Sequence, residues 1–171
     1  MPRYVAFLRG VSPQNLAMSD LRAVLEAARF TDVRTILSSG NAAFTSALKD
    51  ESAVERAAER AMQKLLGRVF YTIVRPSEYL HDLLADDRYA QHDVAASAKR
   101  VVSFFRDIPT PTVPLPLSRD GASVLLVRDR EAYTAYTPSP KGPVFMTLIE
   151  RAFGTDVTTR TLDTVAKCAR A

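Results

Sequence analysis

Two short polar segments near the start of the chain carry the side chains best suited to binding an anion. One follows the apolar run that ends at Leu8, and the other joins two apolar stretches around residue 40. A guanidinium forms charge-assisted hydrogen bonds with carboxylates and phosphates, and hydroxyl and amide groups add neutral donors. The predicted ligand-binding residues in these segments are Arg9, Gly10, Ser12, Asn15, Ser39, Gly40 and Asn41.

A second candidate anion site lies in the Pro-rich stretch 139–143. Lys141 stands just before a helix that the spacing of apolar residues predicts from Val144. The first N–H groups of a helix have no partner within it, and that end carries a partial positive charge. Lys141 is therefore an eighth predicted ligand-binding residue, and a solvated lysine in a tight turn is the structural alternative.

Standard catalytic signatures are absent. The six glycines form neither a dinucleotide-binding fingerprint nor a phosphate-binding loop, and no G-x-S-x-G motif occurs. His81 and His92 are too far apart to suggest a metal site, and Cys168 occupies the position of a small core residue on a helix. No catalytic residue, metal or cofactor is predicted, and the sequence leaves open whether the chain is an enzyme.

Apolar periodicity predicts the elements that position the first two segments. Ser19 is the expected N-cap of the first helix, and Gly67 is expected to end the second. The predicted elements are a strand at 3–8, a helix from 19, strands at 33–37 and 42–45 joined by a turn at 38–41, a helix at 50–66 and a strand at 69–74.

This β-α-β-β-α-β order is the split βαβ pattern of ferredoxin-like folds. In that topology the third strand lies between the first and second, so the loop after Arg9 and the turn at Gly40 share one edge. The end of the long helix at Arg68 is expected on the same edge. The alternative is that these residues serve only local turns and caps.

The second half predicts a less regular version of the same arrangement. The expected elements are a helix at 77–85, a strand at 101–105, a hairpin of 123–127 with 132–136, a helix at 144–153, a strand at 157–159 and a helix at 162–169 capped by Thr161. Four prolines in 108–118 replace the first crossover helix. The predicted fold is α+β, with two ferredoxin-like halves packed together, residues 1–76 and an eroded second half at 77–171.

Composition narrows the functional classes. The chain has 171 residues, 47% of them hydrophobic and 25% charged, which is typical of a globular protein. No apolar run approaches the roughly 20 residues of a membrane helix, and one cysteine excludes an internal disulfide. We therefore expect a cytoplasmic protein without a membrane partner. The net charge of +4 resides in residues 1–75, which carry eleven Lys/Arg and seven Asp/Glu, and such a half can attract anions.

Several motifs together resemble the bacterial domain-of-unknown-function family 1697. They are Tyr4–Val11, Met18 with Leu21, Phe30–Thr35, Ser39–Phe44, Leu148–Gly154 and Thr158–Lys167. The resemblance implies an α+β fold of two ferredoxin-like halves and no established activity. The chain departs from the family pattern after Gly10, where the loop is shorter and lacks a Gly-Gly pair and lysines, and at 161–163, where Thr-Leu-Asp replaces Asn-Trp-Asn.

Three functions remain open on this basis. The leading hypothesis is binding of a small anionic or nucleotide-like ligand at the two N-terminal segments. The second is an enzyme that acts on a phosphorylated substrate at the same edge. The third is a protein or nucleic-acid interaction module, and nucleic acid is the less favoured partner because the strand aromatics are expected in the core. The sequence does not decide the oligomeric state.

Overall fold

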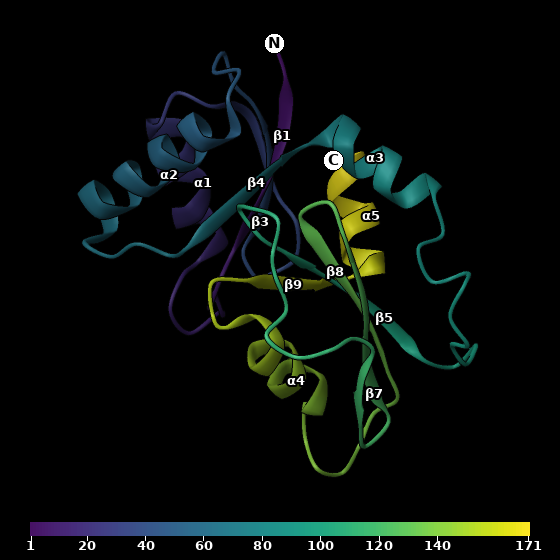
Figure 1. Ribbon diagram of the computed structural model, residues 1–171. Coiled ribbons are helices and arrows are strands. Elements are labelled where there is room, and N and C mark those ends of the chain that lie inside the picture. The colour runs from purple at the N-terminus through teal and green to yellow at the C-terminus, as the bar shows by residue number, and fades with distance from the viewer. The chain divides into compact units, whose positions relative to one another are not determined.

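The computed structural model describes residues 1–171, which divide into two compact units (Figure 1). The first unit comprises Met1–Ala85 with Thr164–Ala171, and the second comprises Asp86–Asp163. This grouping differs from the expected division after residue 76. Helix α3 (Ser77–Ala85) and most of helix α5 (Leu162–Arg170) belong to the first unit.

The first unit is built on a four-stranded antiparallel sheet with the order β2-β3-β1-β4. The third strand therefore lies between the first and the second, as the split βαβ pattern requires. Two helices connect the strands. The elements are β1 (Arg3–Leu8), α1 (Met18–Ala27), β2 (Thr31–Thr35), β3 (Asn41–Thr45), α2 (Glu51–Leu66) and β4 (Thr72–Pro76).

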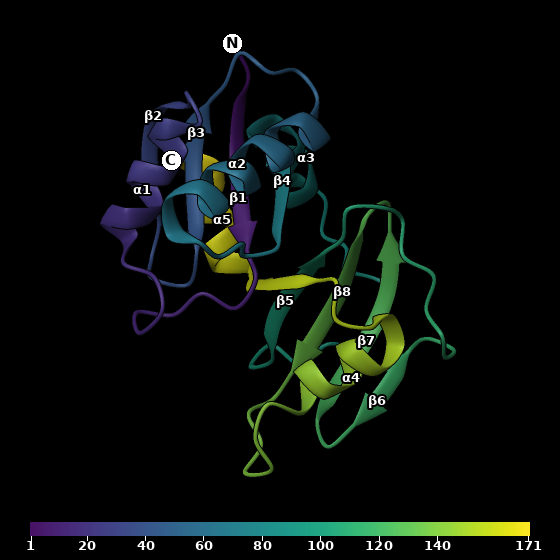
Figure 2. The ribbon, with the colours of Figure 1, turned by 90° about the vertical axis from the view of Figure 1, so that its left-hand side faces the viewer.

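Helices cover both faces of this sheet. Helices α1 and α2 lie on one face, and α3 and α5 lie on the other (Figures 1 and 2). Ala6 and Leu8 of β1 join the core beneath α1 and α2, whereas Val5 and Phe7 point to the opposite face and are equally buried. Alternate side chains of a strand point to opposite faces, so β1 is the central strand that its unbroken apolar sequence predicts.

Helix α2 ends before Gly67 as predicted and begins at Glu51, so the predicted first residue, Asp50, is its N-cap. The Asp50 carboxylate accepts a hydrogen bond from the Ser52 N–H at 3.2 Å, which satisfies one donor of the first turn. Gly67 follows the last helical residue in the left-handed conformation, with φ of 65°. A residue without a Cβ adopts this conformation without steric cost, so the chain can turn sharply here into β4.

The second unit contains a five-stranded antiparallel sheet with the order β6-β7-β8-β5-β9. Without β6, this order repeats that of the first sheet. Helix α4 packs over one face, where Leu148 and Ile149 join an apolar cluster. The elements are β5 (Lys99–Phe104), β6 (Leu117–Arg119), β7 (Ala122–Arg128), β8 (Glu131–Tyr136), α4 (Val144–Phe153) and β9 (Thr158–Thr161).

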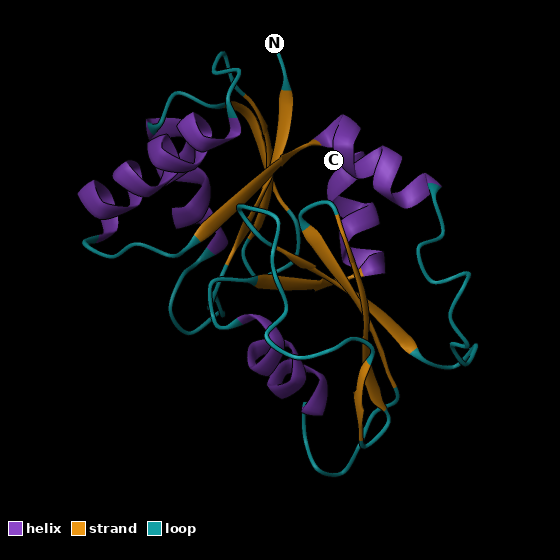
Figure 3. Cartoon of the chain, in the orientation of Figure 1, coloured by secondary structure: helices purple, strands orange, loops and turns teal.

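The Pro-rich segment between β5 and β6 forms no helix (Figure 3). It attaches to the end of α4 instead, where the Thr112 N–H donates to the Ala152 carbonyl at 2.8 Å. The Thr112 hydroxyl donates to the Arg151 carbonyl at 2.9 Å. These bonds satisfy carbonyl groups that a helix end leaves without partners.

Some predicted boundaries are wrong. Helix α1 begins at Met18, so Ser19 lies inside its first turn and is not the N-cap. Strand β2 begins at Thr31, before Asp32 with a positive φ of 48°. Strand β4 spans Thr72–Pro76 in place of the predicted 69–74, and β9 spans Thr158–Thr161 in place of 157–159, so both are shifted toward the C-terminus. Strand β6 is not predicted, because three residues are too few to show an alternating pattern. The α+β class is confirmed, and "ferredoxin-like" stays an interpretation of the strand order.

Candidate functional site

The loop after β1 and the turn between β2 and β3 meet at one edge of the first sheet. The Leu8 N–H donates to the Gly40 carbonyl at 2.9 Å. A Cβ on Gly40 would lie 2.8 Å from Cβ of Val11, closer than real Cβ atoms approach, and 3.1 Å from Cβ of Leu8, tighter than most real contacts. Gly40 therefore permits a close approach of the two segments, at the edge where the strand order predicts it.

The amides expected to bind a ligand make hydrogen bonds within these segments. Asn15 accepts from the Ser12 N–H and donates to the Gly10 carbonyl, both at 2.8 Å. The fully buried Asn41 donates to the Ile36 carbonyl and the Ser39 hydroxyl, both at 3.0 Å. Such bonds stabilise the turns, as the structural alternative proposes.

Arg9 and Gly10 fix the path of the chain out of β1. The Arg9 N–H donates to the Tyr71 carbonyl at 2.8 Å, which joins the end of β1 to the residue before β4. Gly10 follows with a φ of 78°, and a Cβ there would meet no atom within 4 Å. A glycine is therefore favoured at position 10 by the positive φ angle, and not by lack of room for a side chain.

A pocket opens beside these segments at the start of α1, with a volume of about 320 Å³. We call it the α1 pocket. Only Asn15 among the eight predicted ligand-binding residues lines it. The lining residues are Pro13, Gln14, Asn15, Leu16, Ala17, Asp20, Leu66, Arg68 and Phe70.

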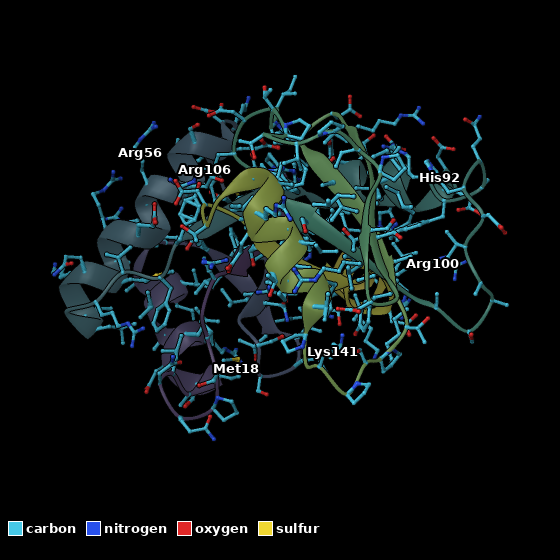
Figure 4. All side chains as sticks on the ribbon, turned by 60° about the horizontal axis from the view of Figure 1, so that its bottom comes forward. Met18, Arg56, His92, Arg100, Arg106 and Lys141 are labelled. Carbon is cyan, nitrogen blue, oxygen red and sulfur yellow. The ribbon has the colours of Figure 1, made fainter.

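The N-terminus of α1 has free backbone donors next to this pocket, which Ala17 and Asp20 line. Ala17 occupies the N-cap in an extended conformation, with φ of −75° and ψ of 143°, and its methyl group cannot accept a hydrogen bond. No acceptor in the chain contacts the N–H groups of Met18, labelled in Figure 4, or Ser19. A Ser, Thr, Asp or Asn at the N-cap would accept from one of these donors, and with alanine there they remain available to a ligand.

Arg68 brings a positive charge to the pocket, and Asp20 brings a negative one. The Arg68 guanidinium carbon lies 4.3 Å from the centre of the Phe70 ring, a cation–π distance that holds the planar group over an apolar surface. No carboxylate pairs with Arg68, and no cation pairs with Asp20. The pocket therefore offers both a cation and an anion to a ligand.

Lys141 belongs to the second unit, whereas the other seven predicted ligand-binding residues belong to the first. Its ammonium is 3.2 Å from a carboxylate oxygen of Asp120, and its N–H donates to the Ser139 hydroxyl at 3.1 Å. A pocket of about 270 Å³ lies beside this pair, with the stacked rings of Tyr136 and Phe145 in its wall, their centres 4.1 Å apart. Lys141 itself does not line that pocket.

Two tyrosines have perturbed acidity because of burial. Desolvation raises the pKa of Tyr4 above its usual value of 10.0, with smaller contributions from Glu51 and Asp50. Desolvation also raises the pKa of Tyr89, whose hydroxyl donates to the Val101 carbonyl at 2.8 Å. Both hydroxyls are committed to backbone carbonyls, since Tyr4 donates to Leu48 at 2.8 Å.

The structure contains no group of three or more His, Cys, Asp or Glu side chains that could hold a metal ion. Cys168 is buried, as its place on the last helix predicts. No helix is both long enough and apolar enough to cross a membrane.

Comparison with known proteins places this fold in a family. The family model described as "Protein of unknown function (DUF1697)" matches residues 1–133. The chain belongs to this family. Among solved structures, the conserved bacterial protein SP0830 from Streptococcus pneumoniae is similar, with a TM-score of 0.69 and 16% identity over 99% of this chain and 97% of that one. That similarity shows a common fold. No curated protein matches the chain.

Sequence reasoning identified part of the α1 pocket. Asn15 was a predicted site residue, and Arg68 was expected on this edge because it follows the Gly67 helix end. Asp20 and Phe70 were not recognised as site residues. Asp20 is an ordinary acidic residue of a first helical turn, and Phe70 is an aromatic residue just before β4 whose place in the pocket wall, beneath the Arg68 guanidinium, depends on the tertiary fold.

Proposed function

We propose that this protein binds a small anionic ligand in the α1 pocket, with the negative group between the Arg68 guanidinium and the free N–H groups that begin α1. The observation that carries the proposal is an unpaired guanidinium, that of Arg68, in the wall of a pocket that opens at the uncapped start of α1. A helix N-terminus favours an anion by about 0.3–1 kcal/mol, and a hydrogen bond to a charged group adds about 1.5–3 kcal/mol.

Asp20 restricts the kind of anion. Its carboxylate lines the same pocket and would repel an isolated phosphate or sulfate. A ligand with a hydroxyl or amino group beside its anionic group avoids this penalty, because the carboxylate accepts a hydrogen bond from that donor. Sugar phosphates and nucleoside monophosphates have this combination of groups.

The size and lining of the pocket agree with a small ligand of this class. A volume of about 320 Å³ is at the lower end of the range for small-molecule sites. Leu16, Leu66 and Phe70 supply an apolar wall against which a sugar or base can pack, and the Gln14 amide adds a further donor and acceptor at the rim.

A thermal-shift screen with ribose 5-phosphate, adenosine monophosphate and inorganic phosphate tests the proposal. A ligand at 100 times its dissociation constant stabilises the folded chain by about 2.7 kcal/mol. For a chain of this size that corresponds to a rise in Tm of roughly 5–10 °C. We expect the organic phosphates to raise Tm more than inorganic phosphate does.

Two variants locate the binding. Arg68→Ala is expected to weaken the best ligand roughly 10- to 100-fold, the equivalent of the lost charged hydrogen bond. Arg56→Ala is the matched control, because Arg56 is an exposed arginine of α2 outside the pocket. The ligand-induced shift is compared within each variant, which removes any effect of Arg68 on intrinsic stability.

Removing the charge of Asp20 tests whether this carboxylate selects organic phosphates over inorganic phosphate. Asp20→Asn removes the repulsion, so we expect inorganic phosphate to bind more tightly and ribose 5-phosphate to gain less. No shift with any of the three compounds, or equal effects of Arg68→Ala and Arg56→Ala, would contradict the proposed site. Release of inorganic phosphate from ribose 5-phosphate would instead support the alternative of an enzyme at this pocket.

A further inference from the structure

A second concave surface lies between the end of α1 and the middle of α2, outside the α1 pocket. It has a volume of about 300 Å³, and we call it the α1–α2 groove. Four alanines from the two helices line it, namely Ala27, Ala28, Ala57 and Ala61. Leu65 borders it with 52% of its surface exposed. The floor is therefore shallow and apolar and can receive a larger side chain.

Three cations line this groove, and none of them has an ionic partner. They are Arg29, Arg60 and Lys64, and no carboxylate lines the groove. Elsewhere on α1 such pairing does occur, since the guanidinium of Arg22 is 2.8 Å from the carboxylate of Glu26, one turn away. For Arg60 and Lys64, the arrangement of residues along α2 explains the missing partner.

That arrangement places like charges at successive turns. Arg56, Arg60 and Lys64 stand four residues apart, so each faces a cation along the helix. Like charges at this spacing destabilise a helix by roughly 0.2–0.5 kcal/mol per pair. Arg56 does not line the groove, and its side chain extends away from α2 into solvent (Figure 4). A negative partner lying over Arg60 and Lys64 would relieve this repulsion.

The backbone holds the third cation in place at a conformational cost. Arg29 has a φ of 68° at the end of α1, where its N–H donates to the Glu26 carbonyl and the Phe30 N–H donates to the Leu25 carbonyl. Glycine is the usual residue at this position of a helix end. The chain therefore has an arginine beside the groove where glycine would fit the backbone better.

We propose that the α1–α2 groove binds an acidic amphipathic segment of a partner protein. An apolar side chain of the segment would occupy the alanine floor beside Leu65, and Asp or Glu residues on either side would face Arg29, Arg60 and Lys64. Helical segments are recognised in this way, with apolar anchors in a groove and complementary charges at its rim.

The lining favours a peptide over a nucleic acid. Single-stranded nucleic acids bind through bases stacked on aromatic rings, and no aromatic residue lines this groove. A phosphate backbone would use the three cations and leave the apolar floor exposed to water. An acidic segment with leucine-sized side chains uses both features.

Fluorescence anisotropy with labelled synthetic peptides tests the proposal on the full chain. The probe peptide has leucine at helical spacing and glutamate elsewhere. A peptide of the same composition in scrambled order, a peptide with lysine in place of glutamate and a single-stranded oligonucleotide are the comparisons. We expect saturable binding of the probe peptide only, with an affinity that falls as salt is added.

Charge and shape are then tested separately. Arg60→Glu combined with Lys64→Glu should weaken the probe peptide at least tenfold, whereas Lys49→Glu, an exposed lysine outside the groove, should change its affinity less than twofold. Ala27→Phe fills the groove and keeps all three cations, and we expect it to weaken binding similarly. Circular dichroism melting verifies that each variant folds.

The proposal is overturned by any of four results. These are no saturable binding of the probe peptide up to about 1 mM, equal binding of the scrambled peptide, tighter binding of the oligonucleotide than of the probe peptide, or full binding by Ala27→Phe. Amide chemical shifts of residues 27–29 and 57–65 that remain unchanged on addition of the probe peptide would have the same effect. None of these outcomes bears on the α1 pocket.

Discussion

Gly40→Ala is the most direct test of the contact between the β1–α1 loop and the β2–β3 turn. The substitution adds one Cβ, which would lie 2.8 Å from Cβ and 2.9 Å from Cγ2 of Val11 and 3.1 Å from Cβ of Leu8. Gly40 is buried, and its carbonyl accepts a hydrogen bond from the Leu8 N–H. Neither segment can therefore move away without breaking this hydrogen bond.

Two energetic costs add at this position. The φ of 87° lies in a region where a residue with a Cβ is destabilised by roughly 1–2 kcal/mol. Forcing extra volume into a packed site adds about 1–3 kcal/mol. The lower entropy of the unfolded alanine chain returns about 0.4–1 kcal/mol. We therefore expect Gly40→Ala to lower the free energy of unfolding of the first unit by about 2–4 kcal/mol.

Gly10→Ala separates the two costs. Its φ of 78° is similar, but its Cβ would meet nothing within 4 Å. Gly10→Ala should therefore cost only the backbone part, about 1–2 kcal/mol less the entropic return. Native-state hydrogen exchange at the amides of Val5 and Phe7 in β1 reports on the first unit alone, which matters in a chain with two units.

A double-mutant cycle with Val11→Gly completes the test. Removing the side chain of Val11 should recover most of the steric cost of Gly40→Ala, which gives a coupling of about 1–3 kcal/mol. If Gly40→Ala proved no more destabilising than Gly10→Ala, or if the cycle showed no coupling, the close contact of the two segments described above would be refuted.

Three further predictions concern a helix start, a tyrosine and a helix end. Ala17→Asp should supply the missing N-cap of α1 and stabilise the first unit by about 0.5–2 kcal/mol in urea unfolding, while abolishing any anion-induced rise in Tm. Burial raises the pKa of Tyr89, so the folded chain keeps this proton longer than the unfolded chain does. Its contribution to stability should be complete below pH about 10 and should be lost as the pH rises above that value, and Tyr89→Phe should remove this pH dependence. Arg29→Gly should stabilise the first unit by about 0.5–1 kcal/mol and weaken the acidic probe peptide, and a destabilised variant would contradict the strain assigned to this helix end.

The sequence predicts those parts of the fold that depend on local signals. Helix α4 has the predicted limits, and α2 begins one residue after the predicted start and ends before the predicted glycine. Strand β1 was recognised as central from its unbroken apolar run. The contact between the loop after Arg9 and the turn at Gly40 followed from strand order, because topology brings together segments that are distant in sequence.

The parts that could not be predicted depend on tertiary contacts. The start of α1 is one residue before Ser19, since the turn formed by Ser12 and Asn15 leads the chain into the helix with Ala17 extended. Helices α3 and α5 lie on the second face of the first sheet and bury Leu80 and Leu83, and Val165 and Cys168, and the local sequence does not encode which face a helix covers. The α1 pocket depends on the position of the Arg68 side chain over Phe70, which no pattern of residue types encodes.

The route of the chain has a consequence for the order in which the two units fold. The second unit is one continuous stretch, Asp86–Asp163, whereas the first needs Thr164–Ala171, whose Val165, Cys168 and Ala169 are buried. During synthesis, every residue of the second unit leaves the ribosome before the segment Thr164–Ala171 that completes the first unit. Domains commonly fold in order from the N-terminus as they emerge. Here the half that is made first must wait, with one face of its sheet incompletely covered, until helix α5 has left the exit tunnel.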